Sequence, residues 1–198
     1  KGHGVRTLIT TKRGAAEEFA RRAILDKPSR VIAAGGDGTF NEAINGVAGS
    51  DVPVAIIPFG TTNVLAKELA IPEDIEGAVG AALRGSAHRV SLGKITFGEG
   101  ASRYFCLMAG VGYDALTVYN LSGRIKRISG KGAHIISGIK TLLSWRPGPL
   151  IFTIDGKAVQ GYSAIICKTK KYAGHFVVSP DAGLEDPALY AFIMHGHR

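Results

Sequence analysis

The chain has 198 residues, enough for one large domain or two small ones, and its hydrophobic share of 45% and charged share of 20% are typical of a globular protein. Its 24 Lys and Arg against 16 Asp and Glu give a net charge of +8, which favours anionic partners such as nucleotides, nucleic acid or an acidic membrane surface. Cys106 and Cys167 are the only cysteines and no apolar run reaches about 18 residues, so we expect reduced buried thiols, a cytosolic setting and no membrane span.

The first 87 residues alternate between strand-like and helix-like patterns, which indicates a parallel sheet surrounded by helices. The expected elements are a strand over 5–10, a helix over 14–26, a strand over 30–34, a helix over 39–47, a strand over 53–57, a helix ending at Leu69 and a helix over 72–84. In such a sheet, ligands bind at the carboxyl ends of the strands.

Two loops of small residues lie at that edge, at residues 35–39 (the first loop) and 58–63 (the second loop). The first loop places three glycines around Asp37 between a buried strand and a helix. Glycines let the backbone approach a ligand, and amide groups at a helix N-terminus bind phosphate. A carboxylate beside phosphates is repulsive unless a divalent cation, a proton or a base offsets it, so we predict a metal-assisted nucleotide site.

From residue 88 the pattern is mainly that of β-strands. Strands are expected over 89–97, 104–109, 150–154, 158–167, 177–179 and 189–194, with a helical insertion between about residues 115 and 145. Asp155-Gly156 is a strong hairpin-turn signal. We therefore expect two domains, residues 1–87 and 88–198, with a substrate site in a cleft between them.

The motif Gly35-Gly36-Asp37-Gly38-Thr39, followed by Asn41-Glu42, resembles the nucleotide loop of the diacylglycerol kinase catalytic superfamily, which includes bacterial lipid kinases and sphingosine kinases. NAD kinases and phosphofructokinases also have a glycine–aspartate loop, so the first loop alone does not distinguish them from the diacylglycerol kinase superfamily. The second loop does. Pro58-Phe59-Gly60-Thr61-Thr62-Asn63 is similar to that superfamily's second nucleotide loop and follows at the right distance. Further matches are Thr11 before Gly14, the segment 110–115 and the segment 179–186.

The resemblance implies a two-lobed α/β fold. The N-terminal lobe would be a Rossmann-like parallel α/β nucleotide-binding lobe similar to those of phosphofructokinases and NAD kinases. The C-terminal lobe would be a β-sandwich with a helical insertion that takes the lipid substrate. The implied activity is transfer of the γ-phosphoryl group of ATP to a lipid hydroxyl, of diacylglycerol or a sphingoid-type lipid, with ATP and Mg²⁺ as cofactors.

The resemblance also implies roles for individual residues. The nucleotide site would comprise Thr11, Gly35, Gly36, Asp37, Gly38, Thr39, Asn41, Glu42, Gly60, Thr61, Asn63 and Lys67. Asp37 would be catalytic through a network of water and Mg²⁺, and Asp114 would face the substrate. The Asp186 carboxylate with the Gly183 and Ala188 carbonyls would hold a metal ion. The general base would lie beyond residue 198.

Three positions depart from the superfamily's pattern. Val64 stands where many bacterial members have an aspartate, Lys67 replaces an arginine, and Asp186-Pro187 replaces aspartate-glycine. The chain starts without Met and ends just after an apolar run, so we expect a fragment that lacks both termini. Two alternatives stay open: a NAD kinase-like enzyme, although no Asn-x-Gly-x-x-Gly-Phe segment supports it, and a non-catalytic nucleotide- or lipid-binding module.

A basic and apolar stretch over residues 124–145 carries Arg124, Lys126 and Arg127 on one side and ends at Trp145. It fits a helix packed on the second domain, or a lipid entrance resting on anionic headgroups. We therefore expect a nucleotide and a lipid at an anionic membrane surface as partners, no nucleic acid, and a cytoplasmic, peripherally membrane-associated protein. A homodimer stays open.

Overall fold

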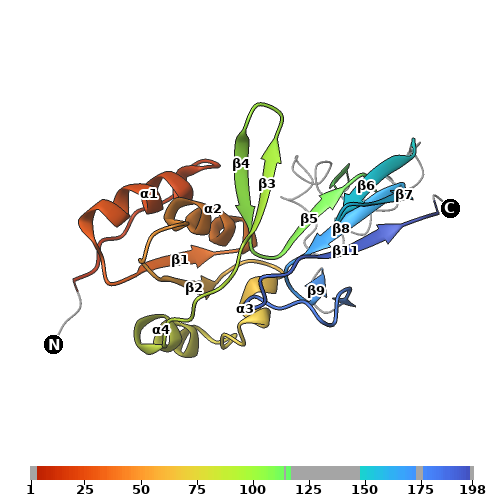
Figure 1. Cartoon of the computed structure of the whole chain (residues 1–198). Coiled ribbons are helices and arrows are strands. Elements are labelled where there is room, and N and C mark those ends of the chain that lie inside the picture. Colours follow the sequence, from red (N-terminus) through yellow and green to blue (C-terminus); the bar gives the residue numbers. More distant parts are fainter. Residues whose placement is uncertain (1–3, 114, 117–147, 173–175, 197–198) are drawn as a thin grey trace. The chain divides into compact units, whose positions relative to one another are not determined.

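The computed structural model describes residues 4–113, 115–116, 148–172 and 176–196. They belong to two compact units, Lys1–Phe105 and Cys106–Arg198 (Figure 1). Both parallel and antiparallel strand pairs are present, so the expected mixed α/β class is confirmed. Within the described part of the chain, no helix has the length and apolar character needed to cross a membrane.

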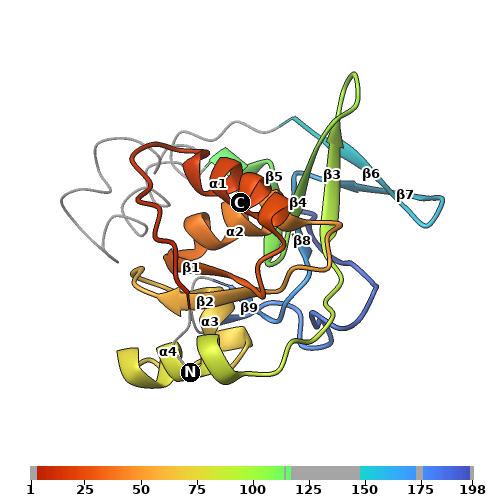
Figure 2. The ribbon, with the colours of Figure 1, turned by 90° about the vertical axis from the view of Figure 1, so that its left-hand side faces the viewer.

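The first unit is built around the parallel strands β1 (Val31–Gly35) and β2 (Val54–Pro58). Helices α1 (Ala15–Ala23) and α2 (Asp37–Val47) lie on one side of these strands, and α3 (Val64–Glu68) and α4 (Ile75–Arg84) on the other (Figure 2). A short 3₁₀ turn, η1 (Ile24–Asp26), follows α1. The fully buried Phe40 of α2 packs in the core of this unit with Ala33 and Ile56 from the strands, which are also buried.

Small residues allow α1 and α2 to pack closely. A Cβ atom on Gly46 would lie 2.5 Å from the Glu17 carbonyl oxygen and 2.7 Å from the Ala20 Cβ. The helix pair therefore requires glycine at position 46, and α2, which starts at the first loop, is held at a fixed place over β1.

The antiparallel hairpin of β3 (Gly93–Phe97) and β4 (Ala101–Phe105) belongs to the first unit. The side chain of Asn45 in α2 forms two hydrogen bonds to the backbone of this hairpin. It donates to the Tyr104 carbonyl at 2.9 Å and accepts from the Tyr104 N–H at 2.9 Å, as a neighbouring strand would. Arg103 forms an ion pair with Glu17 at 2.9 Å. The division between units thus falls at residue 105 rather than at the expected residue 87.

The second unit contains a three-stranded antiparallel sheet in the order β11-β8-β5. Its strands are β5 (Met108–Val111), β8 (Ser163–Cys167) and β11 (Tyr190–Met194), accompanied by the pairs β6 (Leu150–Ile154) with β7 (Lys157–Gly161) and β9 (Lys171–Tyr172) with β10 (Phe176–Val177). Asp155 and Gly156 have φ angles of 49° and 77°, so the predicted hairpin turn is confirmed. Cys106 and Cys167 are buried thiols, as expected.

Three predicted strands differ from the structure. Residues 5–10 form no strand, because they have no partner strand in the described part of the chain, and Val5 and Ile9 are exposed. The expected strand over 104–109 is interrupted where the chain passes from one unit to the other. The strand over 158–167 divides at Tyr162, where pairing with β6 ends and pairing with β11 begins. The helical insertion, including residues 124–145, lies outside the described residues.

Candidate active site

The two loops contact each other through their backbones. Gly35 is in register with Pro58 at the ends of β1 and β2, and the Phe59 N–H donates to the Gly35 carbonyl at 2.7 Å. A Cβ atom on Gly60 would lie 2.6 Å from the Gly36 Cα, closer than real Cβ contacts. Glycine is therefore required where the loops cross, and the predicted residues Gly35, Gly36 and Gly60 are brought together.

The second loop is held in shape by Asn63. Its side-chain oxygen accepts from the Gly60 N–H at 2.9 Å, and its side-chain nitrogen donates to the Gly60 carbonyl at 2.8 Å. Asn63 also has a left-handed backbone, with φ of 47°, which asparagine adopts more readily than most residues. Both polar atoms of the Asn63 side chain are thus used to stabilise the second loop. Thr61 in the same loop is exposed.

Asp37 is the first residue of α2, and its carboxylate binds the start of α3. Its two oxygens accept hydrogen bonds from the N–H groups of Val64 and Leu65, each at 3.0 Å. The N-cap residue of α3, Asn63, makes no side-chain capping bond, so Asp37 supplies the cap from a distant part of the sequence. The motif gave no sign of this structural role.

Glu42 likewise binds backbone N–H groups at the start of α1. Its carboxylate accepts from the N–H groups of Gly14 and Ala16 at 2.9 and 3.3 Å. The neighbouring Asn41 accepts a hydrogen bond from Asn45 through its backbone carbonyl at 2.8 Å. The acidic member of the Asn41-Glu42 pair therefore fixes the packing of α1 on α2. Thr11 is exposed in the segment that leads to α1, and Lys67 lies half-buried on α3.

The N-terminus of α2 is open to an anion. Its N-cap residue, Gly36, has an extended backbone and no side chain to cap the eleven-residue helix. Gly38 is exposed and a Cβ atom there would meet nothing within 4 Å, whereas a Cβ on Gly35 would lie 2.7 Å from the Thr39 hydroxyl. The first N–H groups of a helix have no intrahelical partner and carry a partial positive charge.

The residues predicted to hold a metal ion surround a lysine instead. The fully buried Lys168 donates from Nζ to the carbonyls of Gly183 at 3.1 Å, Ala188 at 3.3 Å and Asp186. Since a second positive charge on these oxygens would be repelled, this arrangement does not fit a divalent ion. The described residues also contain no cluster of three or more His, Cys, Asp or Glu side chains that could hold a metal.

The Asp186 carboxylate is engaged elsewhere. It accepts from the Ala188 N–H at 2.8 Å and from the Tyr190 hydroxyl at 2.7 Å. These two bonds, in that order, place the pKa of Asp186 below its ordinary value, with a smaller contribution from the Lys168 charge and an opposing one from desolvation. The same hydrogen bond raises the pKa of Tyr190, and desolvation and the charges of Asp186 and Asp181 add to it.

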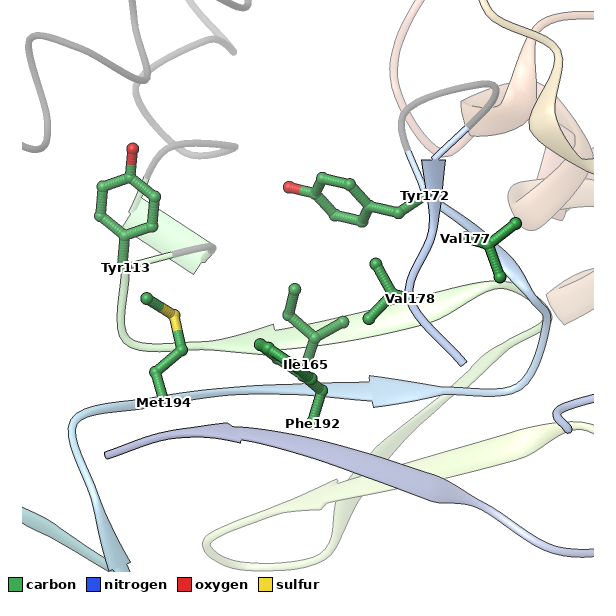
Figure 3. Close-up of a pocket in the computed structure, with 7 residues that line it drawn as sticks. All are labelled: Tyr113, Ile165, Tyr172, Val177, Val178, Phe192 and Met194. Atoms are coloured by element: carbon green, nitrogen blue, oxygen red, sulfur yellow. The ribbon is translucent and has the colours of Figure 1, made fainter. Parts of the chain in front are cut away.

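The second unit also has an apolar pocket that the sequence did not suggest. It has a volume of about 360 Å³ (Figure 3). Its lining consists of aromatic and aliphatic residues: Tyr113, Ile165, Tyr172, Val177, Val178, Phe192 and Met194. Phe192 is paired with Ile165 across β11 and β8, and Phe192 and Met194, two residues apart, share one face. The predicted substrate residue Asp114 lies outside the described residues.

Comparison with known proteins gives a consistent result. Residues 1–95 match the family model of the diacylglycerol kinase catalytic domain. A diacylglycerol kinase of Bacillus subtilis (strain 168) is 34% identical over 190 residues, which are 93% of this chain and 61% of that protein. One from Staphylococcus aureus (strain JH9) is 33% identical over 189 residues, 93% of this chain and 58% of that protein.

A solved structure of a putative diacylglycerol kinase from Bacillus anthracis str. Sterne superposes with a TM-score of 0.70 at 23% identity, over 94% of this chain and 62% of that one. This likeness supports the fold. The chain spans about three fifths of the length of these relatives. The chain is thus similar to diacylglycerol kinases along 93% of its length, and its residues 1–95 match the family model of their catalytic domain.

Proposed function

We propose that this chain forms the nucleotide site and part of the lipid site of an ATP-dependent lipid kinase, which transfers the γ-phosphoryl group to the hydroxyl of diacylglycerol or a sphingoid-type lipid. The observation that carries the proposal is the backbone contact between Gly36 and Gly60, which joins two loops beside the uncapped N-terminus of α2. Relatives named diacylglycerol kinase support the lipid as acceptor.

In the nucleotide site, the N–H groups of Gly38 and Thr39 at the start of α2 would bind phosphate oxygens. Gly36 and Gly60 let the two loops touch beside the phosphates, because a Cβ atom at either position would lie against the other loop. Thr61 and Lys67 would bind from the second loop and α3. Thr11 would complete the pocket from the segment before α1. Mg²⁺ bound with ATP would neutralise charge on the transferred phosphoryl group.

Three polar residues of this site also hold its elements in place. Asn63 shapes the second loop, Glu42 fixes α1, and Asp37 ties α2 to α3. A carboxylate has about four lone-pair positions, so Asp37 retains acceptor capacity for water molecules around Mg²⁺. Asp37 would thus combine a positioning role with the expected role in the metal network.

The lipid chain would occupy the apolar pocket of the second unit. Its volume of about 360 Å³ and its aromatic and aliphatic lining suit an acyl or sphingoid chain. In this proposal, the β-rich unit is the lipid lobe, Asp114 would face the lipid headgroup, and Arg124, Lys126 and Arg127 would rest on an anionic membrane surface. The enzyme would be cytoplasmic and would bind the membrane peripherally.

Nucleotide binding can be tested with Gly38→Glu. The position is open and an acidic residue in the first helical turn is favourable for the helix, so the fold should be retained. The carboxylate would repel phosphate, and we expect ATP affinity measured by titration calorimetry to fall at least about tenfold. Gly148→Glu, at an exposed glycine in the second unit, should bind ATP normally. Equal affinity in both variants would refute the proposed phosphate site.

The acceptor is tested with radiolabelled γ-phosphate transfer by the whole natural protein that contains this chain. Vesicles carrying diacylglycerol, sphingoid bases, ceramide or phosphatidylglycerol are offered, with soluble NAD in a parallel reaction. Labelled lipid is the expected product. Labelled NADP would favour the NAD kinase alternative, and nucleotide binding without any transfer would favour the non-catalytic module.

A further inference from the structure

Lys168 directly follows β8 and is fully buried, yet it carries a charged group. Its ammonium donates to three backbone carbonyls, those of Gly183, Asp186 and Ala188, which all belong to the segment that leads into β11. An ammonium group has three N–H donors and no acceptor, so three carbonyls match its capacity. The burial of this lysine is thus compensated by hydrogen bonds.

A converging set of backbone carbonyls is also the kind of ligand set that binds Ca²⁺ or another hard cation. In this chain the centre of that set is taken by a side chain. We infer that the Lys168 ammonium serves as the permanent cation of the loop 183–188, so that the loop is ordered without any divalent metal ion.

The arrangement of Asp186 supports this inference independently. Its carboxylate bonds the Ala188 N–H, two residues ahead, and the Tyr190 hydroxyl. Such a bond from an aspartate to the backbone two residues on is an Asx turn, which an intervening proline favours because its φ is fixed. Pro187 therefore holds the carboxylate in the turn, where it balances the lysine charge.

The exposed Lys170 provides a matched control. It carries the same charge two residues further along the same segment, and its backbone carbonyl accepts from the Val178 N–H. Lys168→Ala and Lys170→Ala thus remove the same charge and the same number of atoms. Only the first variant removes a donor to the loop carbonyls.

The test measures thermal unfolding of the full chain without nucleotide in three solutions, which contain about 5 mM EDTA, about 10 mM CaCl₂ or about 10 mM MgCl₂. These cation concentrations are high enough to fill a weak Ca²⁺ site. For the native chain we expect the same Tm, within about 1 °C, in all three solutions. Lys168→Ala should unfold at least about 5 °C below Lys170→Ala and should regain part of that difference with Ca²⁺ or Mg²⁺, which can enter the vacated place.

Two results would overturn the inference. One is a native chain whose Tm falls in EDTA or rises by several degrees with either cation, because the loop would then depend on a metal ion. The other is a Lys168→Ala variant as stable as Lys170→Ala. If Lys168→Ala does not fold while Lys170→Ala does, the lysine is required for folding, and Ca²⁺ is then titrated into the native chain. Absence of binding heat supports Lys168 as the cation of the loop, and stoichiometric binding refutes it.

Discussion

Asp37→Asn should destabilise the first unit even when no nucleotide is bound. The Asp37 carboxylate accepts from the N–H groups of Val64 and Leu65, one per oxygen and each at 3.0 Å. Asparagine keeps one acceptor but presents an NH₂ group, itself a donor, to the second N–H. Because α3 has only five residues and no side-chain cap of its own, nothing else in its sequence replaces the lost bond.

The magnitude follows from the bond that is lost. A hydrogen bond to a charged group contributes about 1.5–3 kcal/mol, so we expect the free energy of unfolding to fall by about 2 kcal/mol. The first unit spans Lys1–Phe105, a size at which 1 kcal/mol changes Tm by about 4–8 °C. Asp37→Asn should therefore lower the Tm of this unit by roughly 8–16 °C.

The assay is thermal and urea unfolding followed by far-UV circular dichroism, with Asp74→Asn as the matched control. Asp74 is an exposed N-cap residue that accepts from the Gly77 N–H at 2.7 Å at the start of α4. Asparagine caps a helix about as well as aspartate, so this control should change stability little. If the two variants unfold at the same temperature, the structural role of Asp37 is refuted. If Asp37→Asn is the less stable, its kinase activity must be measured well below its Tm.

Three further predictions follow from the contacts. Glu42→Gln should weaken the cap on α1 by about 1 kcal/mol. Relative to the native chain, amide hydrogen exchange should then become faster in α1 but not in α4, and an equal change in both helices would contradict this. Gly60→Ala should lower Tm because its Cβ would lie 2.6 Å from the Gly36 Cα, whereas Gly38→Ala, in open space, should not. The lowered pKa of Asp186 means that its stabilising effect is complete above the ordinary value of 3.8 and is lost as the pH falls through the folded value. Tyr190→Phe removes one of the bonds that lower this pKa, so the loss of stability below about pH 4, measured by urea unfolding, should become less steep. An unchanged slope would contradict this.

Periodicity predicted the regular elements of the first unit well. The helix expected over 14–26 is α1 with its 3₁₀ extension, and the strands expected over 30–34 and 53–57 are β1 and β2, each displaced by one residue. The positions of the two loops followed from these strands. Local patterns suffice here because apolar spacing and turn residues act between near neighbours in the sequence.

Contacts between distant residues were not predictable in this way. Asp37 and Glu42 bond backbone groups 26 to 28 residues away. Asn45 holds a hairpin 59 residues further along the chain. Nothing in the local sequence distinguishes a carboxylate that binds a neighbouring helix from one that faces a ligand. The same is true of Lys168, whose acceptors come 15 to 20 residues later.

The contacts of Asp37 also bear on the electrostatics of the first loop. A carboxylate beside phosphates is repulsive, and from the sequence we expected a metal ion, a proton or a base to offset it. The structure adds another source of compensation, because two backbone N–H groups at the start of α3 bond the carboxylate. Such groups carry partial positive charge, so they reduce the repulsion that Asp37 would exert on a phosphate at α2. The anion site at α2 can therefore form before Mg²⁺ arrives, and ATP binding to the native chain in EDTA should remain measurable by calorimetry. Complete loss of binding in EDTA would show that the two amides are insufficient and that the metal ion must come first.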